Sequence, residues 1–398
     1  MKTVVLGITG SIAAYKACEI VSRLKKAGCN VRCILTKAGA EFITPLSLES
    51  LAQSPVVTDM FSRENPYEIE HISLARAADI FVIAPATANF LAKAAVGIAD
   101  DMLSTTVLAT KAPILIAPAM NDNMYDNVAT VNNIAILKRR GAKFVEPEVG
   151  LLACGTVGRG RMAEPEQIVS RIMYELRGKM LFGKKILITA GATREMLDPV
   201  RFLSNRSTGK MGYSIAQAAV DMGAEVSLVS GISEEKTPFG VKRIGVLSTE
   251  EMKNACIIEA ESADVVISAA APCDFTPEAY SKNKIKKSDF DMMIKLRGTS
   301  DILKTLSEKY PGKILVGFAA ETDRVAENAK KKLSDKKLFA IAANDISKAN
   351  CGFISETNDI TIYMENGKTF NSGLLTKYEV GKFLLERIFD VANEIDHK

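Results

Sequence analysis

One local pattern occurs twice in this chain, once near the start and once near the middle. Residues 3–11 are an apolar run of strand length followed by a turn with glycine and hydroxyl groups, and residues 12–27 then have helical periodicity. Residues 185–193 repeat the strand and turn, and a longer loop at 204–210 precedes the next helical pattern. The first N–H groups of a helix lack partners and favour an anion such as phosphate. Neither turn is a complete dinucleotide fingerprint or Walker P-loop. We therefore predict two mononucleotide sites.

Strand-length apolar runs alternate with helical patterns in both halves. The expected strands include residues 31–35, 80–84, 113–117, 186–189, 225–229, 265–269, 314–318 and 339–343, and the expected helices include 12–27, 91–109 and 128–140. This alternation predicts an α/β fold of two Rossmann-like parallel-sheet domains in tandem. Residues 359–370, with an Asn-Gly turn, predict an added C-terminal β-hairpin, and a final helix follows over about 375–395. At 398 residues we expect two domains, 1–182 and 183–398.

Composition excludes several classes of protein. The net charge of +4 is mild, and no basic run has interleaved aromatic residues, so we expect anionic small-molecule substrates and no nucleic acid. Seven cysteines without framework spacing are typical of reduced thiols, and two histidines without a Cys-x-x-Cys pair disfavour zinc. The apolar run at 80–99 is interrupted by Pro85, Asn89 and Lys93 and falls short of the roughly 20 apolar residues that span a bilayer. We expect a cytoplasmic protein without a membrane partner.

Polar residues in the first half follow the expected strands, where open α/β sheets bind ligands. These candidates are Gly10, Ser11, Thr36, Thr87, Asn89, Met120 and Asn121. Hydroxyl and amide groups suit a phosphate and the polar edge of a flavin, whereas the alternative is ordinary helix capping by Ser11 and Thr87.

Two further residues carry groups that can move a proton. His71 is a candidate base near neutral pH, although a lone histidine is commonly a surface or satisfied core residue. Cys154 lies in a glycine-rich segment, residues 150–162, which we interpret as mobile. Arg159 and Arg161 are placed to stabilise its thiolate or to hold an anionic substrate, and the alternative is a small buried cysteine.

Four motifs of the first half, at residues 7–16, 84–89, 118–124 and 153–162, resemble the flavin-dependent cysteine decarboxylases, and specifically phosphopantothenoylcysteine decarboxylase. The resemblance implies non-covalently bound FMN, a base at His71, a carboxylate-holding amide at Asn121 and a flap cysteine at Cys154 that protonates a late intermediate. The family often has Trp where this chain has Tyr125.

The second half contains a separate set of candidate residues. The loop at 204–210 offers hydroxyls and cationic side chains at a helix start, as a triphosphate requires. Asp274 ends an expected strand, where it suits Mg²⁺ or, alternatively, caps a turn. Lys284, Lys286 and Lys287 form a cationic cluster that could bind phosphates, and the alternative is an ordinary solvated surface.

This half resembles phosphopantothenate–cysteine ligase over nearly its whole length. That resemblance implies CTP, Mg²⁺ and an acyl-cytidylate intermediate, with Asn205 and Lys284 catalytic and Asp274 near the metal. The nucleotide residues that it implies, together with the loop residues, are Arg201, Ser207, Thr208, Gly209, Asp274, Lys284, Phe318, Asn344 and Asp345. The family has Val-Ala-Asp-Tyr where this chain has Pro272-Cys273-Asp274-Phe275.

The order of the two halves resembles the bifunctional coenzyme A biosynthesis family. The resemblance implies that 4'-phosphopantothenate, cysteine and CTP are substrates, and that the chain forms a homo-oligomer up to a dodecamer. Two other readings are a decarboxylase of peptide C-terminal cysteines, which shares the first-half motifs, and a regulatory flavin-binding protein without activity.

Overall fold

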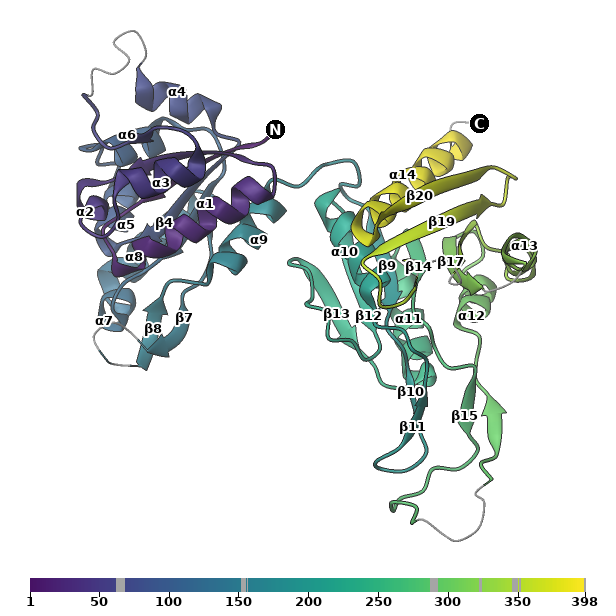
Figure 1. The fold of residues 1–398 in the computed structure, drawn as a ribbon. Coiled ribbons are helices and arrows are strands. Elements are labelled where there is room, and N and C mark those ends of the chain that lie inside the picture. Colours follow the sequence, from purple (N-terminus) through teal and green to yellow (C-terminus); the bar gives the residue numbers. More distant parts are fainter. Residues whose placement is uncertain are drawn as a thin grey trace. The chain divides into compact units, whose positions relative to one another are not determined.

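The chain divides into two compact units, Met1–Leu176 and Arg177–Lys398 (Figure 1). This computed structural model describes residues 1–61, 69–151, 155, 157–286, 293–321, 324–345, 350 and 352–396. The division falls a few residues before the expected boundary at 182. Each unit is an α/β domain with its own sheet, as the alternating sequence pattern predicts.

Unit 1 is built on a six-stranded parallel sheet with the order β3-β2-β1-β4-β5-β6. The strands are β1 (Thr3–Ile8), β2 (Asn30–Leu35), β3 (Val56–Val57), β4 (Ile80–Ala86), β5 (Ile114–Pro118) and β6 (Lys143–Phe144). Every residue of β4 is buried, as its continuous apolar sequence requires. The strand order reverses at β1, so the crevice for a ligand is expected beside the carboxyl end of this strand.

Helices cover both faces of this sheet (Figure 1). They are η1 (Ile12–Tyr15), α1 (Lys16–Lys26), α2 (Lys37–Ala40), α3 (Pro45–Ala52), α4 (Glu70–Ala77), α5 (Ala88–Val96), α6 (Met102–Ala109), α7 (Asp122–Asp126), α8 (Val128–Arg139) and α9 (Pro165–Glu175). Alternate strand residues point to opposite faces, so Leu6 packs with α1 and α9 whereas Phe81 packs with α5 and α6. A hairpin of β7 (Glu148–Leu151) and β8 (Val157–Arg161) precedes α9.

The single helix expected over residues 91–109 is wrong, because the chain forms two helices there. Gly97, at φ 83°, ends α5 in the left-handed conformation that favours glycine. Asp101 then begins α6 through a capping box with Ser104. Apolar periodicity continues across the break and hides it from a pattern search.

Unit 2 contains an eight-stranded mixed sheet with the order β13-β12-β9-β14-β17-β18-β19-β20. Its strands are β9 (Lys185–Ala190), β12 (Glu225–Ser230), β13 (Val241–Gly245), β14 (Val265–Ser268), β17 (Ile314–Glu321), β18 (Ala340–Asp345), β19 (Thr357–Met364) and β20 (Thr369–Thr376). All pairs up to β18 are parallel, and β19 and β20 add the expected antiparallel hairpin. Gly367, at φ 84°, makes its turn.

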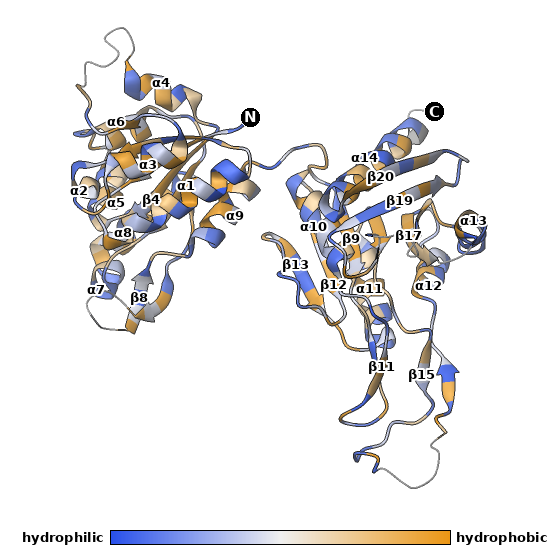
Figure 2. Ribbon diagram, in the orientation of Figure 1, coloured by the Kyte–Doolittle hydropathy of each residue, from blue (hydrophilic) through white to orange (hydrophobic). Residues whose placement is uncertain are grey.

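The helices of unit 2 are α10 (Lys210–Asp221), α11 (Thr249–Ser262), α12 (Ile302–Lys309), α13 (Val325–Asp335) and α14 (Lys377–Asp396). Helix α14 packs on α10, whereas α13 is mainly hydrophilic (Figure 2). Among the described residues, no helix has both the length and the apolar character needed to cross a bilayer.

Two short antiparallel ribbons extend from the sheet of unit 2 and were not predicted (Figure 1). One ribbon pairs β10 (Arg194–Met196) with β11 (Phe202–Ser204), and the other pairs β15 (Phe275–Pro277) with β16 (Leu296–Gly298). Strand β10 packs beside β15. Strands of three residues are too short to give a periodic signal in the sequence.

Candidate active sites

A buried threonine marks the reversal of strand order in each unit. After β1, the Thr9 hydroxyl donates to the Pro85 carbonyl at 2.8 Å and accepts from the Thr87 N–H at 3.1 Å. Within β9, the Thr189 hydroxyl accepts from the Ala270 N–H at 3.1 Å. In each unit, these bonds join the end of the central strand to the neighbouring strand or to the residues that follow it. Each junction lies at a cavity, in the place where open α/β sheets bind ligands.

The cavity of unit 1 has a volume of about 720 Å³ and lies at the carboxyl ends of β1, β2, β4 and β5. The structure brings together there all the residues expected to bind the cofactor, namely Gly10, Ser11, Thr36, Thr87, Asn89 and Met120. Four different loops or helix starts supply them, so the cavity exists only in the folded unit.

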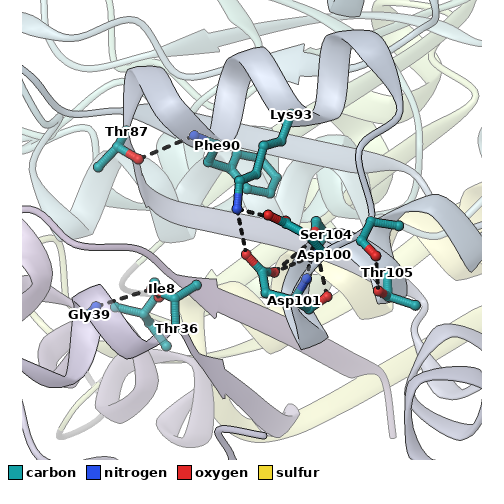
Figure 3. A network of polar contacts seen from close by, with 11 residues as sticks. Ile8, Thr36, Gly39, Thr87, Phe90, Lys93, Asp100, Asp101, Ser104 and Thr105 are labelled. Carbon is teal, nitrogen blue, oxygen red and sulfur yellow. Dashed lines mark hydrogen bonds and ion pairs between the residues drawn. The ribbon is translucent and has the colours of Figure 1, made fainter. Parts of the chain in front are cut away.

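The hydroxyl residues at this cavity cap helices. Ser11 accepts from the Ala13 N–H at 3.3 Å. Thr36 accepts from the Gly39 N–H at 3.1 Å, and Thr87 accepts from the Phe90 N–H at 3.4 Å (Figure 3). The capping alternative therefore holds for Ser11 and Thr87, and the same residues also line the cavity. At Gly10 a Cβ atom would lie 2.5 Å from the Ala38 Cβ, so the first turn requires a glycine.

Sequence analysis missed a charged cluster on the cavity wall. Lys93 lies between Asp100, at 2.7 Å, and Asp101, at 3.2 Å (Figure 3). The hydrogen bond with Asp100 raises the pKa of Lys93. Burial opposes ionisation of Asp101, but hydrogen bonds from Ser104 and Lys93 outweigh burial and lower its pKa. Only the interruption of the apolar run by Lys93 indicated that this lysine was unusual.

Unit 1 does not place His71 or Asn121 in the lining of this cavity. His71 is the second residue of α4 and is half-buried, and Asn121 caps α7 by accepting from the Asn123 N–H at 2.9 Å. Among the described residues, the cavity lining includes Met120 and Met124 but neither His71 nor Asn121. Cys154 lies outside the described residues.

The two arginines that follow Cys154 contact glutamates. Glu146 accepts from Arg159 at 3.0 Å, from Lys138 at 2.8 Å and from the Tyr125 hydroxyl at 2.9 Å. The Arg159 guanidinium also lies 5.1 Å from the centre of the Tyr125 ring. Burial, and then the bond to Glu146, raises the pKa of Tyr125 to about 12. Arg161 contacts Glu164 at 2.6 Å.

The β7–β8 hairpin docks closely on the segment that ends in Asn121. A Cβ atom on Gly160 would lie 2.2 Å from the Met120 carbonyl oxygen, and one on Gly158 would lie 2.5 Å from an Asp122 carboxylate oxygen. The Met120 N–H donates to the Gly160 carbonyl at 3.1 Å. Gly158 and Gly160 are therefore docking positions of strand β8, and both lie in the segment that the sequence predicts to be mobile.

The cavity of unit 2 has a volume of about 360 Å³. The expected nucleotide residues that line it are Ser207, Thr208, Gly209, Asp274, Phe318 and Asn344. Gly209, at φ 90°, precedes α10 without a side-chain cap, so the first turn of α10 presents backbone N–H groups at the cavity. Asp345 ends β18, and its side chain lies outside the described residues.

Four lysines, Lys210, Lys332, Lys336 and Lys377, bring positive charge to this cavity. Lys377 is buried and donates to the Gly352 and Phe353 carbonyls at 3.3 and 3.0 Å. Burial, and then the charge of Lys210, lowers the pKa of Lys377. Lys336 pairs with Asp301 at 2.8 Å. Sequence analysis missed Lys332, Lys336 and Lys377, because in sequence they are ordinary residues of charged helices.

The remaining ligase candidates lie on the ribbons beside the cavity. The Asn205 amide donates to the Ala271 and Pro272 carbonyls at 3.1 and 3.0 Å, and both of these residues line the cavity. Arg201 donates to the Ile285 carbonyl at 3.0 Å and thereby contacts the loop that contains Lys284. Among the described residues, the lining does not include Arg201, Asn205 or Lys284.

The departure from the family at Pro272 and Cys273 has a structural account. Pro272 and Cys273 both line the cavity, and Cys273 is largely buried, with its thiol 3.6 Å from the Thr193 and Leu203 carbonyl oxygens. Asp274 is exposed at the cavity. In the described part of the chain, no three His, Cys, Asp or Glu residues gather as a metal site. One carboxylate suits Mg²⁺ only where nucleotide phosphates supply other ligands.

Two α/β units, each with a cavity at the reversal of its strand order, define a tandem α/β protein with one candidate ligand site in each unit. Comparison with known families divides the chain in the same way. Residues 1–177 match the family described as Flavoprotein, and residues 181–391 match the DNA/pantothenate metabolism flavoprotein C-terminal domain.

Relatives match nearly the whole chain. The coenzyme A biosynthesis bifunctional protein CoaBC of Bacillus subtilis (strain 168) is 46% identical over 391 residues, which are 97% of this chain and 96% of that protein. The protein of the same name from Escherichia coli (strain K12) is 40% identical over 394 residues, with 97% and 96% covered. The chain belongs to the family of coenzyme A biosynthesis bifunctional proteins. It is a bifunctional enzyme with a flavoprotein decarboxylase half and a ligase half.

Solved structures resemble each half. A crystal structure of the C-terminal domain of a coenzyme A biosynthesis bifunctional protein CoaBC is 42% identical, covers 55% of this chain and 100% of that chain, and has a TM-score of 0.48. A PPC decarboxylase mutant complexed with pantothenoylaminoethenethiol is 34% identical, covers 43% of this chain and 96% of that chain, and has a TM-score of 0.40.

Proposed function

We propose that unit 2 joins cysteine to 4'-phosphopantothenate through an acyl-cytidylate, converting CTP to CMP and pyrophosphate. Unit 1 then decarboxylates 4'-phosphopantothenoylcysteine to 4'-phosphopantetheine with FMN. The observation that carries this proposal is that all six residues expected to bind FMN line one cavity of unit 1, and six of the nine expected to bind CTP line one cavity of unit 2. The product of unit 2 is the substrate of unit 1, so fusion links consecutive steps.

The residues of unit 1 fit FMN. The Gly10-Ser11 turn and the starts of α2 and α5 offer hydroxyls and backbone N–H groups for a phosphate, and Asn89 and Met120 offer an amide and an apolar wall. When bound, FMN would take two electrons from the substrate, which makes the cysteinyl carboxylate labile, and would return them after loss of CO₂, so that the reaction has no net oxidation. We expect its binding to be non-covalent. The cysteines described as free, including Cys18 and Cys273, support a reducing cytoplasmic setting.

His71, Asn121 and Cys154 are proposed to act on the substrate. His71 removes a proton during oxidation of the substrate, Asn121 holds the carboxylate through its amide N–H, and Cys154 returns a proton to the enethiolate left by loss of CO₂. Because His71 and Asn121 lie outside the cavity lining of their own unit, we propose a homo-oligomer, a dodecamer at full size, in which they serve the cavity of another copy.

The charges at the unit 2 cavity suit acyl activation. A carboxylate must approach a triphosphate, and two anions repel each other. Lys210, Lys332, Lys336 and Lys377, with Mg²⁺ held by Asp274 and the phosphates, offset that repulsion. Lys284 is proposed to stabilise the charge that moves to pyrophosphate, whereas Arg201 and Asn205 hold the acyl-cytidylate for attack by cysteine. We propose that Phe318 and the Asn344-Asp345 segment bind the base.

A single incubation tests the proposal. The protein, reconstituted with FMN, is mixed with 4'-phosphopantothenate, CTP, cysteine and Mg²⁺, and the products are identified by mass spectrometry. We expect CMP, pyrophosphate, CO₂ and 4'-phosphopantetheine. A yellow protein that forms none of these products would be a regulatory flavin-binding protein. Decarboxylation of a peptide with a C-terminal cysteine, without turnover of the small substrate, would favour the peptide-modifying alternative.

A further inference from the structure

We infer that Asp198 is a positioning residue of the ligase site, whose buried carboxylate fixes the loop of Lys284 to the turn that carries Arg201. This inference rests on the proposed role of Lys284 and adds to it the group that holds the lysine loop in place. Asp198 lies between β10 and β11, whereas Lys284 lies in the loop between β15 and β16. The two residues are therefore parts of different ribbons.

Asp198 is fully buried, with 0% of its surface exposed, and each carboxylate oxygen contacts a different element. Oδ1 accepts from the Val200 and Arg201 N–H groups at 2.7 and 2.8 Å, and these bonds shape its own turn. Oδ2 accepts from the Ile285 N–H at 3.1 Å and reaches the other ribbon. Burial opposes ionisation, but the three backbone N–H groups outweigh burial and lower the pKa of Asp198.

Arg201 makes a second connection between the same segments. Its guanidinium donates to the Ile285 carbonyl at 3.0 Å, and its other terminal nitrogen lies 3.8 Å from the Asp198 carboxylate. The N–H and the C=O of Ile285 are thus both held by the turn at 198–201. Lys284 immediately precedes Ile285, so its backbone position is set by these contacts, and the Ser281 N–H bond to the Leu197 carbonyl at 3.0 Å supports the start of the loop.

The turn at 198–201 does not by itself require a buried carboxylate at Asp198. An asparagine caps such a turn equally well through one oxygen, whereas a buried ion carries a desolvation cost that its hydrogen bonds must offset. The second oxygen is what distinguishes Asp198, because it accepts from the lysine loop. Asp198→Asn keeps the size and one acceptor, and it places an amide donor opposite the Ile285 donor.

The experiment uses the full-length protein and measures pyrophosphate release from 4'-phosphopantothenate and CTP without cysteine. We expect Asp198→Asn to slow release by about tenfold or more, since a lost hydrogen bond to a charged group has an effect of this order. Asp264→Asn is a control for the loss of one backbone hydrogen bond, because the exposed Asp264 accepts from the Lys185 N–H at 2.7 Å and is not in the cavity lining. Decarboxylation of supplied 4'-phosphopantothenoylcysteine is the internal control and should be unchanged.

A double-mutant cycle separates positioning from a structural role. If Asp198 acts through Lys284, Asp198→Asn combined with Lys284→Gln should release pyrophosphate as slowly as Lys284→Gln alone. The inference is overturned if the fold-losses in pyrophosphate release of the two single variants multiply in the double variant. It is also overturned if Asp198→Asn releases pyrophosphate at the wild-type rate. Neither result changes the proposed role of Lys284. Wild-type release by Lys284→Gln overturns the inference and the proposed role of Lys284 together.

A second variant tests the inference if Asp198→Asn does not fold, which thermal unfolding would reveal. Ile285→Pro removes the N–H donor of the half-buried Ile285 and leaves the Asp198 side chain in place, and it also fixes φ at 285 and restricts the backbone of Lys284. If the inference is correct, Ile285→Pro slows pyrophosphate release. Adding Lys284→Gln to this variant should then cause no loss beyond that of Lys284→Gln alone. Retained release by a folded Ile285→Pro variant overturns the inference.

Discussion

The arginines beside Cys154 show how one contact changes the interpretation of a residue. In sequence, Arg159 and Arg161 are cations available to a thiolate or an anionic substrate. In the structure, Arg159 contacts Glu146 and Arg161 contacts Glu164, so each charge has an intramolecular partner. Lysines do gather at the cavity of unit 2, and two of them, Lys210 and Lys336, likewise have acidic partners in Glu356 and Asp301.

His71→Asn should abolish decarboxylation and leave ligation intact. A general base contributes roughly 10²–10⁴-fold to a rate, and His71 belongs to unit 1 alone. The variant should therefore accumulate 4'-phosphopantothenoylcysteine from 4'-phosphopantothenate, CTP and cysteine, as measured by mass spectrometry. Unchanged CO₂ release from this variant would remove His71 from the mechanism.

Asn205→Asp and Lys284→Gln should separate the two ligase half-reactions. Asn205 offers hydrogen bonds but no charge, and its contacts with the Ala271 and Pro272 carbonyls place it at the cavity edge. Asn205→Asp should still release pyrophosphate without cysteine and then convert the intermediate slowly, whereas Lys284→Gln should lose the release itself. An Asn205→Asp variant that forms no acyl-cytidylate would contradict this division of roles.

Glu146 should make the stability of unit 1 depend on pH. Burial raises its pKa, but bonds from Lys138 and Tyr125 outweigh burial and hold it below the ordinary value of 4.5. The charged form therefore stabilises the folded unit above about pH 4.5, and this stabilisation is lost as the pH falls through the lower folded-state pKa. The difference in unfolding temperature between the wild type and Glu146→Gln should shrink over that range. A difference that is constant with pH would show that the charge of Glu146 has no role.

At the scale of elements, the β7–β8 hairpin packs closely because it has glycines, which lack a side chain, at its contact positions. Gly160→Ala should destabilise unit 1 by roughly 1–3 kcal/mol, because the new Cβ atom would meet the Met120 carbonyl oxygen at 2.2 Å. Gly150→Ala in the same hairpin is the matched control, since its nearest neighbours are Arg161 side-chain atoms at 3.5 Å. Thermal unfolding of both variants checks the prediction, and equal unfolding temperatures would refute the docking argument.

At the scale of the whole molecule, the two units have separate cores and separate cavities. We expect residues 1–182 alone to bind FMN, because every candidate cofactor residue lies within that segment. Acid precipitation of the purified fragment should release an intact chromophore into solution, as non-covalent binding requires. A flavin that remains with the precipitate would indicate a covalent bond.

Much of this architecture was determined by the sequence alone, because its signals are local. Strand-length apolar runs, glycine turns and capping hydroxyls act within a few residues, so they predicted two parallel-sheet units and the Gly10, Thr36 and Thr87 positions. The tertiary structure decided which distant residues meet. Lys93 meets Asp100 and Asp101 across a helix break, Lys377 reaches the nucleotide cavity from the last helix, and Asp198 holds a loop of another ribbon. Such contacts depend on packing between elements far apart in sequence, and no periodicity within a segment encodes them.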